Sequence, residues 1–111
     1  MEKVTLVGAG GKMGMRITRN LKDADYSMNY LEVSQNGIKQ LKDIGIEVSN
    51  EDQVIPESHM VILAVPDVVL GKVSEKVIPK MKKGSLVVTL DPAAALADKL
   101  YSREDISYFI T

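Results

Sequence analysis

Four of the chain's eight glycines fall within one seven-residue segment, from Gly8 to Gly14, and this cluster constrains the fold more than any other feature. A short apolar and β-branched run, residues 3–7, precedes it, and residues 13–21 follow with apolar side chains at four-residue spacing. The first pattern is typical of a buried strand and the second of an amphipathic helix. The segment therefore predicts a strand, a glycine turn and a helix in direct succession.

The same alternation continues along the chain. Apolar runs predict six strands, at residues 3–7, 28–33, 46–48, 60–65, 86–90 and 106–110. Helical spacing predicts helices at residues 13–21, 38–44 (closed by Gly45), 69–78 and 93–100. The continuous apolar run 60–65 is typical of a strand covered on both faces. We therefore expect residues 1–111 to form one α/β domain, a Rossmann-type, doubly wound, mostly parallel six-stranded sheet with helices on both faces.

Composition narrows the possible functions. The 111 residues are 45% hydrophobic and 26% charged, as in an ordinary globular domain. The net charge is −1 with both signs scattered, which gives no support to a nucleic-acid surface, and the run Lys80, Lys82 and Lys83 is expected to be a solvated helix end. The lack of cysteine excludes disulfides and thiolate metal sites. No stretch approaches the roughly 18 apolar residues of a membrane span, so we expect a cytoplasmic protein without a membrane partner.

A glycine turn between a strand and a helix is the usual place for a dinucleotide pyrophosphate, because bare backbone lets the phosphates approach and the helix N-terminus attracts them. The spacing departs from G-x-G-x-x-G and leaves two alignments, in which either Gly10 or Gly11 stands between Gly8 and Gly14. A glycine turn that binds no ligand is the alternative. The candidate phosphate site comprises Gly8, Gly10, Gly11, Lys12, Met13 and Gly14.

Glu32 lies 18 residues after Gly14, near the end of the second predicted strand. A carboxylate there can accept hydrogen bonds from the adenosine ribose and would repel a 2′-phosphate. No arginine occurs in residues 33–36, although Lys39 could reach a phosphate. The pattern favours NAD over NADP as the cofactor, and a plain surface glutamate is the alternative.

The fourth predicted strand runs into Ala64, Val65, Pro66 and Asp67. Small and rigid residues at this strand end would let the nicotinamide ribose and the pyrophosphate lie across it. Asp67 could bond the cofactor or cap the following helix. Asp91 follows the fifth strand in the same way, but a cap or a turn is the favoured explanation for it.

The remaining candidates concern catalysis. His59 is the only histidine, and it is expected at the amino-terminal end of the sheet, away from a ligand. The Lys12 side chain could touch a phosphate or point to solvent. Met13, Ile17 and Leu21 are expected in the core, and Met13 could also pack against the cofactor. No paired carboxylates, serine elbow or histidine cluster occurs, so we assign neither a catalytic residue nor a metal ligand.

Three segments carry a family resemblance. The chain resembles the cofactor domain of the 6-phosphogluconate and β-hydroxyacid dehydrogenase superfamily, and the similarity covers essentially its whole length. The segments that carry the resemblance are residues 4–14 (VTLVGAGGKMG), 60–67 (MVILAVPD) and 83–91 (KGSLVVTLD). The glycine turn together with residues 106–111 (ISYFIT) is most similar to the phosphogluconate-dehydrogenase-like group that contains D-apionate oxidoisomerase.

The resemblance implies an NAD-dependent oxidoreductase that transfers a hydride at a hydroxyl of a small sugar acid, coupled in this group to isomerisation. By position, the turn from Gly10 to Gly14 would bind pyrophosphate, Glu32 the adenosine ribose, and Asp67 the cofactor nearer the nicotinamide. No catalytic residue carries over. In that family a helical domain follows, which supplies substrate contacts and a homodimer interface. We therefore expect residues 1–111 to bind cofactor without appreciable turnover.

Two alternatives remain open. The G-x-x-G-x-x-G reading of the turn also resembles dihydrodipicolinate reductase, although that match is local. A non-enzymatic module, either a dinucleotide sensor or an interaction domain, could use the same fold.

Overall fold

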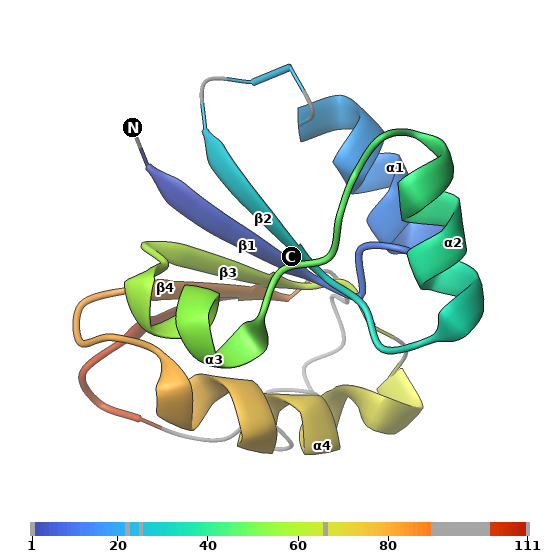
Figure 1. Cartoon of the computed structure of the whole chain (residues 1–111). Coiled ribbons are helices and arrows are strands. Elements are labelled where there is room, and N and C mark those ends of the chain that lie inside the picture. Colours follow the sequence, from blue (N-terminus) through green and yellow to red (C-terminus); the bar gives the residue numbers. More distant parts are fainter. Residues whose placement is uncertain (1, 22, 25, 66, 90–102, 111) are drawn as a thin grey trace.

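A single parallel sheet forms the centre of the molecule (Figure 1). The computed structural model describes residues 2–21, 23–24, 26–65, 67–89 and 103–110. Its strands follow the order β2-β1-β3-β4-β5, so the order reverses between β1 and β3. The strands are β1 (Lys3–Val7), β2 (Ser27–Leu31), β3 (Met60–Leu63), β4 (Leu86–Thr89) and β5 (Ser107–Ile110). Ligands of open α/β sheets bind where the order reverses, at the carboxyl ends of the strands.

Helices cover both faces of the sheet, as the sequence predicted. α1 (Lys12–Leu21) and α2 (Gln35–Asp43) lie on one face, and α3 (Glu51–Val54) and α4 (Asp67–Val77) lie on the other (Figure 1). Two 3-10 turns, η1 (Ile55–Glu57) and η2 (Ile78–Lys80), extend α3 and α4. No helix in the described ranges is long and apolar enough to cross a bilayer.

Alternating side chains of the strands divide the core into two clusters. Val4 and Leu6 of β1 point to the α1/α2 face, whereas Val7 points to the α3/α4 face. The first cluster also includes Met15, Tyr30 and Leu41, and the second includes Ile55, Leu63, Leu70 and Val77. This arrangement of two cores around one parallel sheet is the doubly wound architecture.

The prediction of six strands is wrong, because residues 46–48 form none. Ile46 is buried in the α1/α2 core, and its N–H completes the helix cap at Gly45 by donating to the Leu41 carbonyl at 2.9 Å. The segment then meets β2 through one backbone hydrogen bond, from the Ser49 N–H to the Tyr30 carbonyl at 2.8 Å. A single hydrogen bond does not make a ladder, so the sheet formed by the described residues has five strands.

The prediction that Met13 lies in the core is also wrong, because its side chain is 47% exposed. Helix α1 begins at Lys12, and its buried residues are Gly14, Met15 and Thr18. Gly14 lies directly against the Gly8 carbonyl, so the neighbouring Met13 faces away from the sheet and lines a pocket near the carboxyl ends of the strands. Ile17 and Leu21 are partly buried against the α1/α2 core, as predicted. The predicted helix at residues 93–100 lies outside the described residues.

Candidate functional site

The glycine turn lies at the point where the strand order reverses, between β1 and α1. The amides of Gly8 and Ala9 both donate to the Leu31 carbonyl at the end of β2, at 2.9 and 3.0 Å. The Gly11 amide donates to the Gly8 carbonyl at 3.1 Å, and the Met15 amide donates to the Gly11 carbonyl at 2.8 Å. The turn is therefore fixed to β2 at one end and passes directly into α1 at the other.

Three of the turn's glycines are required by packing. Gly8 has a φ of +79°, and a Cβ there would lie 2.5 Å from the Ala64 carbonyl oxygen. A Cβ on Gly14 would collide with the Gly8 carbonyl, and one on Gly10 would lie 2.5 Å from the carbonyl carbon of Gly37. Gly11 differs, because the nearest atom to its Cβ would be the Gly8 oxygen at 3.5 Å. Of the two alignments, the packing triplet is thus Gly8, Gly10 and Gly14, and Gly11 borders open space.

Two pockets flank this turn and share Gly11, Ala64 and Val65. The first, here called the α1 pocket, has a volume of about 440 Å³. Its other lining residues are Lys12, Met13 and Arg16 of α1. The first-turn amides of a helix have no intrahelical acceptor, and the helix dipole adds partial positive charge there. The α1 pocket therefore combines two side-chain cations with a helix N-terminus.

The second pocket, the α4 pocket, has a volume of about 390 Å³ and lies between the ends of β1 and β2 and helix α4. Most of its lining is aliphatic, and Glu32, Glu51, Lys72 and Lys76 provide charge at it. Its aliphatic residues are Val7, Leu31, Val33, Ala64, Val65, Val69, Val73 and Val77. Such a cleft suits a flat, largely apolar ring whose polar substituents reach the rim.

Glu32 follows β2 directly and is held by three backbone amides. Its Oε1 accepts from the Gly10 amide at 2.9 Å, and its Oε2 accepts from the amides of Val33 at 3.1 Å and Ser34 at 3.0 Å. These bonds fix the carboxylate between the glycine turn and the start of α2. Since it also lines the α4 pocket, Glu32 presents negative charge at a defined position there.

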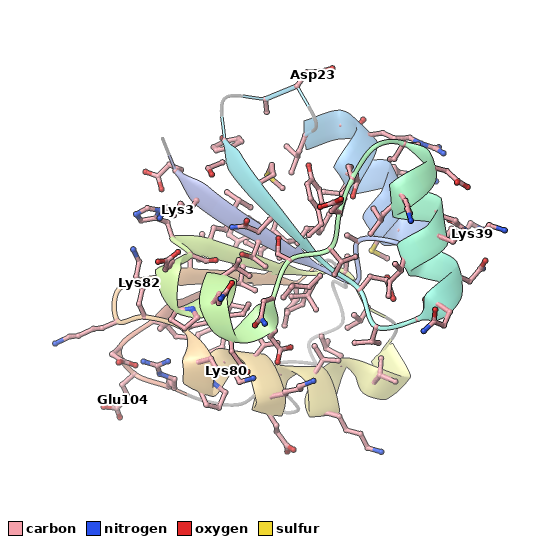
Figure 2. The ribbon with its side chains drawn as sticks, in the orientation of Figure 1. Lys3, Asp23, Lys39, Lys80, Lys82 and Glu104 are labelled. Atoms are coloured by element: carbon pink, nitrogen blue, oxygen red, sulfur yellow. The ribbon has the colours of Figure 1, made fainter. Side chains whose placement is uncertain are left out.

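A charge cluster borders the α4 pocket on the side of α3. Lys80 donates to Glu51 Oε2 at 2.6 Å and to Asp52 Oδ1 at 2.7 Å, and it is labelled in Figure 2 between α3 and the end of α4. The hydrogen bond from Lys80 lowers the pKa of Asp52, and the bonds to both carboxylates raise the pKa of Lys80. Lys76 lies 3.7 Å from the same Glu51 oxygen. Glu51 is therefore paired with two lysines. Lys80 is accordingly an ion-paired residue, which the expectation of a solvated helix end did not include.

The structure assigns positions to most of the other predicted site residues. Ala64 is buried and Val65 half-buried at the end of β3, and Asp67 is the first residue of α4. Pro66 and Asp91 lie outside the described residues. Lys39 extends outward from α2 in Figure 2, away from the glycine turn.

His59 lies at the amino-terminal end of the sheet, as predicted. Its Nδ1 accepts a hydrogen bond from the Lys3 amide at 2.9 Å, and its own amide donates to the Lys3 carbonyl at 2.8 Å. This edge is opposite to the carboxyl ends of β1 and β3, where the two pockets lie. The histidine is thus remote from the candidate site.

Sequence reasoning missed several residues that shape the site. Gly37, in the first turn of α2, packs against both Glu32 and Gly10. Arg16 of α1 and Val69, Lys72 and Val73 of α4 line the pockets. The helical spacing in residues 69–78 predicted a helix but could not show that part of this helix borders a pocket. Nothing in the sequence around Gly37 indicates that this glycine packs against Glu32 and Gly10.

A doubly wound parallel sheet with a glycine turn at the reversal point, a following helix N-terminus and an acidic residue after the second strand defines a dinucleotide-binding domain of the Rossmann type. The chain belongs to the family of the NAD-binding domain of 6-phosphogluconate dehydrogenase, whose model matches residues 3–101. It is accordingly an NAD-binding domain.

Curated relatives and a solved structure agree with this family. The chain is 48% identical to D-apionate oxidoisomerase from Pectobacterium atrosepticum over 99% of its own length and 39% of that protein's. It is 44% identical to the enzyme of the same name from Cupriavidus necator, over 98% of the chain and 40% of the relative. The chain thus spans about two fifths of the length of these relatives.

The solved structure is that of a semialdehyde dehydrogenase NAD-binding protein from Cupriavidus necator in complex with calcium and NAD. It matches with a TM-score of 0.92 and 42% identity, over 99% of this chain and 40% of that one. These findings confirm the predicted family resemblance, including the predicted similarity to the D-apionate oxidoisomerase group, and NAD as the cofactor.

Proposed function

We propose that residues 1–111 form the cofactor domain of an NAD-dependent oxidoreductase, with NAD lying along the carboxyl ends of β2, β1 and β3. The observation that carries this proposal is the pair of pockets joined at Gly11, one bordered by the N-terminus of α1 and the other by Glu32. A dinucleotide has this form, with two nucleosides joined by a doubly charged pyrophosphate.

In this proposal the pyrophosphate crosses the turn at Gly11, the position where the structure leaves room beside the backbone. The amides of Lys12 and Met13, in the first turn of α1, would face its oxygens. The Lys12 and Arg16 side chains line the same pocket and would add charge compensation. Gly8, Gly10 and Gly14 would act indirectly, because their close packing against neighbouring backbone holds the turn in a position that lets the phosphates approach.

The adenosine half would occupy the α4 pocket. Its aliphatic lining, including Val33, Val69 and Val73, would cover the adenine ring, and Glu32 would accept hydrogen bonds from the ribose hydroxyls. A carboxylate held by three amides cannot turn away easily, so a 2′-phosphate would meet fixed negative charge. This geometry supports NAD over NADP. Ala64, Val65, Pro66 and Asp67 would adjoin the nicotinamide half.

Bound NAD supplies the hydride acceptor for oxidation of a hydroxyl. The chain's own residues bind and orient it, and we assign no catalytic residue among the described ones. We propose a small sugar acid as the substrate, with hydride transfer accompanied by isomerisation. The identity of 44–48% to the D-apionate oxidoisomerases supports this substrate class. Substrate contacts would come from outside this domain.

We further propose that the domain works as part of a cytoplasmic homodimeric enzyme. The cysteine-free composition is consistent with a reducing compartment, and the relatives are metabolic enzymes. Sedimentation of the whole enzyme that is proposed to contain this domain, at several concentrations, tests this assembly, and a single monomeric species would contradict it.

Titration calorimetry tests the cofactor proposal directly. Wild type is titrated with NAD and with NADP, and the measurements are repeated on Glu32→Ala. We expect NAD to bind more tightly than NADP, and Glu32→Ala to weaken NAD by about tenfold to a hundredfold, because a charge-assisted hydrogen bond is worth about 1.5–3 kcal/mol. Glu104→Ala, at an exposed position near β5, is the control and should leave both affinities unchanged.

A folded wild type that binds neither nucleotide would contradict the proposal. It would instead favour an interaction module that uses the fold without the cofactor. Tight NAD binding that alters association with a partner protein, without turnover in the longer protein, would favour a sensor.

A further inference from the structure

Gly37 occupies the first turn of α2 and is buried. A Cβ at this position would lie 2.6 Å from Cδ and 2.7 Å from Cγ of Glu32, and 2.7 Å from Oγ of Ser34. These distances are far shorter than van der Waals contact. The carboxylate of Glu32 therefore occupies the space that a side chain at residue 37 would fill.

The other side of Gly37 meets the glycine turn. A Cβ on Gly10 would lie 2.5 Å from both Cα and the carbonyl carbon of Gly37. Gly10 also donates its amide to Glu32 Oε1 at 2.9 Å. Glu32, Gly10 and Gly37 thus form a closed set of three mutual contacts, contributed by the end of β2, the phosphate turn and α2.

Hydrogen bonds at the start of α2 fix the geometry of this set. Ser34 is the N-cap, and its Oγ accepts from the Gly37 amide at 3.0 Å. The Ser34 amide donates in turn to Glu32 Oε2 at 3.0 Å. The helix start is therefore bonded to the same carboxylate that the glycine turn binds, and neither can shift without displacing Glu32.

We propose that Gly37 is a positioning residue for the cofactor, because its missing side chain lets α2 hold the Glu32 carboxylate against the Gly10 amide. The inference rests on the proposed dinucleotide site and deepens it. The phosphate turn and the ribose-binding carboxylate then behave as one unit, so the preference for NAD over NADP depends on a residue that touches neither nucleotide.

The test compares Gly37→Ala with Asn36→Ala, an exposed neighbour in the same helical turn. Titration with NAD and NADP is combined with the proton chemical shift of the Gly10 amide in the ligand-free protein. We expect Gly37→Ala to weaken NAD by roughly five- to tenfold, to reduce the NAD/NADP ratio, and to move the Gly10 amide shift upfield as its bond to the carboxylate is lost. Asn36→Ala should change none of these beyond twofold.

Coupling to Glu32 separates positioning from a general loss of structure. If Gly37 acts through Glu32, adding Gly37→Ala to Glu32→Gln should weaken NAD little further, because the carboxylate that it positions is already gone. Additive losses in the double variant would overturn the proposal. So would a Gly37→Ala variant with wild-type NAD affinity, NAD/NADP ratio and Gly10 amide shift.

A second variant covers the case in which Gly37→Ala does not fold. Ser34→Ala adds no atoms and removes the cap on the Gly37 amide, so it should loosen the same contact and weaken NAD about twofold to fivefold, with an upfield Gly10 shift. Unchanged binding and shift in Ser34→Ala would then overturn the proposal. Failure of wild type to bind NAD would instead refute the proposed function, and the Gly10 shift in the free variants would still decide the structural coupling.

Discussion

Gly14 packs against the carbonyl group of Gly8 so closely that a Cβ on Gly14 would lie 2.8 Å from the Gly8 carbonyl carbon. This contact brings the first turn of α1 onto the end of β1. Because the obstructing atoms are backbone, they cannot rotate away as a side chain could. We expect Gly14→Ala to lower the free energy of unfolding by about 3 kcal/mol, the upper range for overpacking. Urea denaturation followed by circular dichroism measures this loss, and wild-type stability would contradict the close packing.

Gly11→Val should behave in the opposite way. The nearest atom to a Cβ at Gly11 would be 3.5 Å away, and the residue has no positive φ, so the fold should tolerate the change. The new side chain would project where the phosphates are proposed to cross. We expect a free energy of unfolding within about 1 kcal/mol of wild type and at least tenfold weaker NAD binding. Wild-type NAD affinity in this variant would exclude Gly11 from the phosphate site.

The glycine cluster also shows which features of the site could be predicted from the sequence. The spacing of the glycines predicted a tight turn between a strand and a helix, and the fold confirms the position of that turn, whereas its binding of phosphate stays a proposal. The spacing could not show whether Gly10 or Gly11 belongs to the closely packed triplet, because Gly10 packs against Gly37, which lies 27 positions later in the chain. Apolar runs likewise predicted the strands now seen as β1 to β5. They failed at residues 46–48, where a helix cap and one hydrogen bond replace a strand ladder.

Arg103 connects the end of α4 to the segment before β5. Its Nη1 donates to the carbonyls of Ile78 at 2.8 Å and Met81 at 2.7 Å, and its Nε and Nη2 bind Asp105 at 2.8 and 2.6 Å. We expect Arg103→Ala to cost about 2 kcal/mol of stability, since it removes charged donors from half-buried carbonyls. Arg103→Lys should recover little of it, because an ammonium group cannot form the planar two-sided arrangement. Chemical denaturation of both variants measures the difference, and full recovery in the lysine variant would contradict it.

Asp105 should make part of this stability depend on pH. The hydrogen bond from Arg103 is the main reason that the pKa of Asp105 lies below its ordinary value. A carboxyl with a lower pKa in the folded state stabilises the fold above its unfolded pKa and loses that contribution as the pH falls through the folded value. We therefore expect Asp105→Asn to melt below wild type at pH 7, with the gap closing below about pH 4. Thermal melts at pH 7, 5 and 3 measure the gap, and Glu104→Gln serves as the control. A gap that stays constant across this range would contradict the assignment.

Val69 tests the adenosine half of the proposed site without disturbing the fold. It lies on α4, lines the α4 pocket and is 37% exposed, so little of the core depends on it. A carboxylate in Val69→Glu would lose solvent on contact with an adenine ring and would add negative charge near Glu32. We expect NAD affinity to fall by roughly tenfold or more, in keeping with a desolvation cost of about 1–3 kcal/mol, while the melting temperature stays close to that of wild type. Glu75→Ala, on an exposed part of the same helix outside the pocket lining, is the matched control. If Val69→Glu binds NAD as wild type does, the adenine ring does not occupy the α4 pocket, whether or not Glu32 is still required.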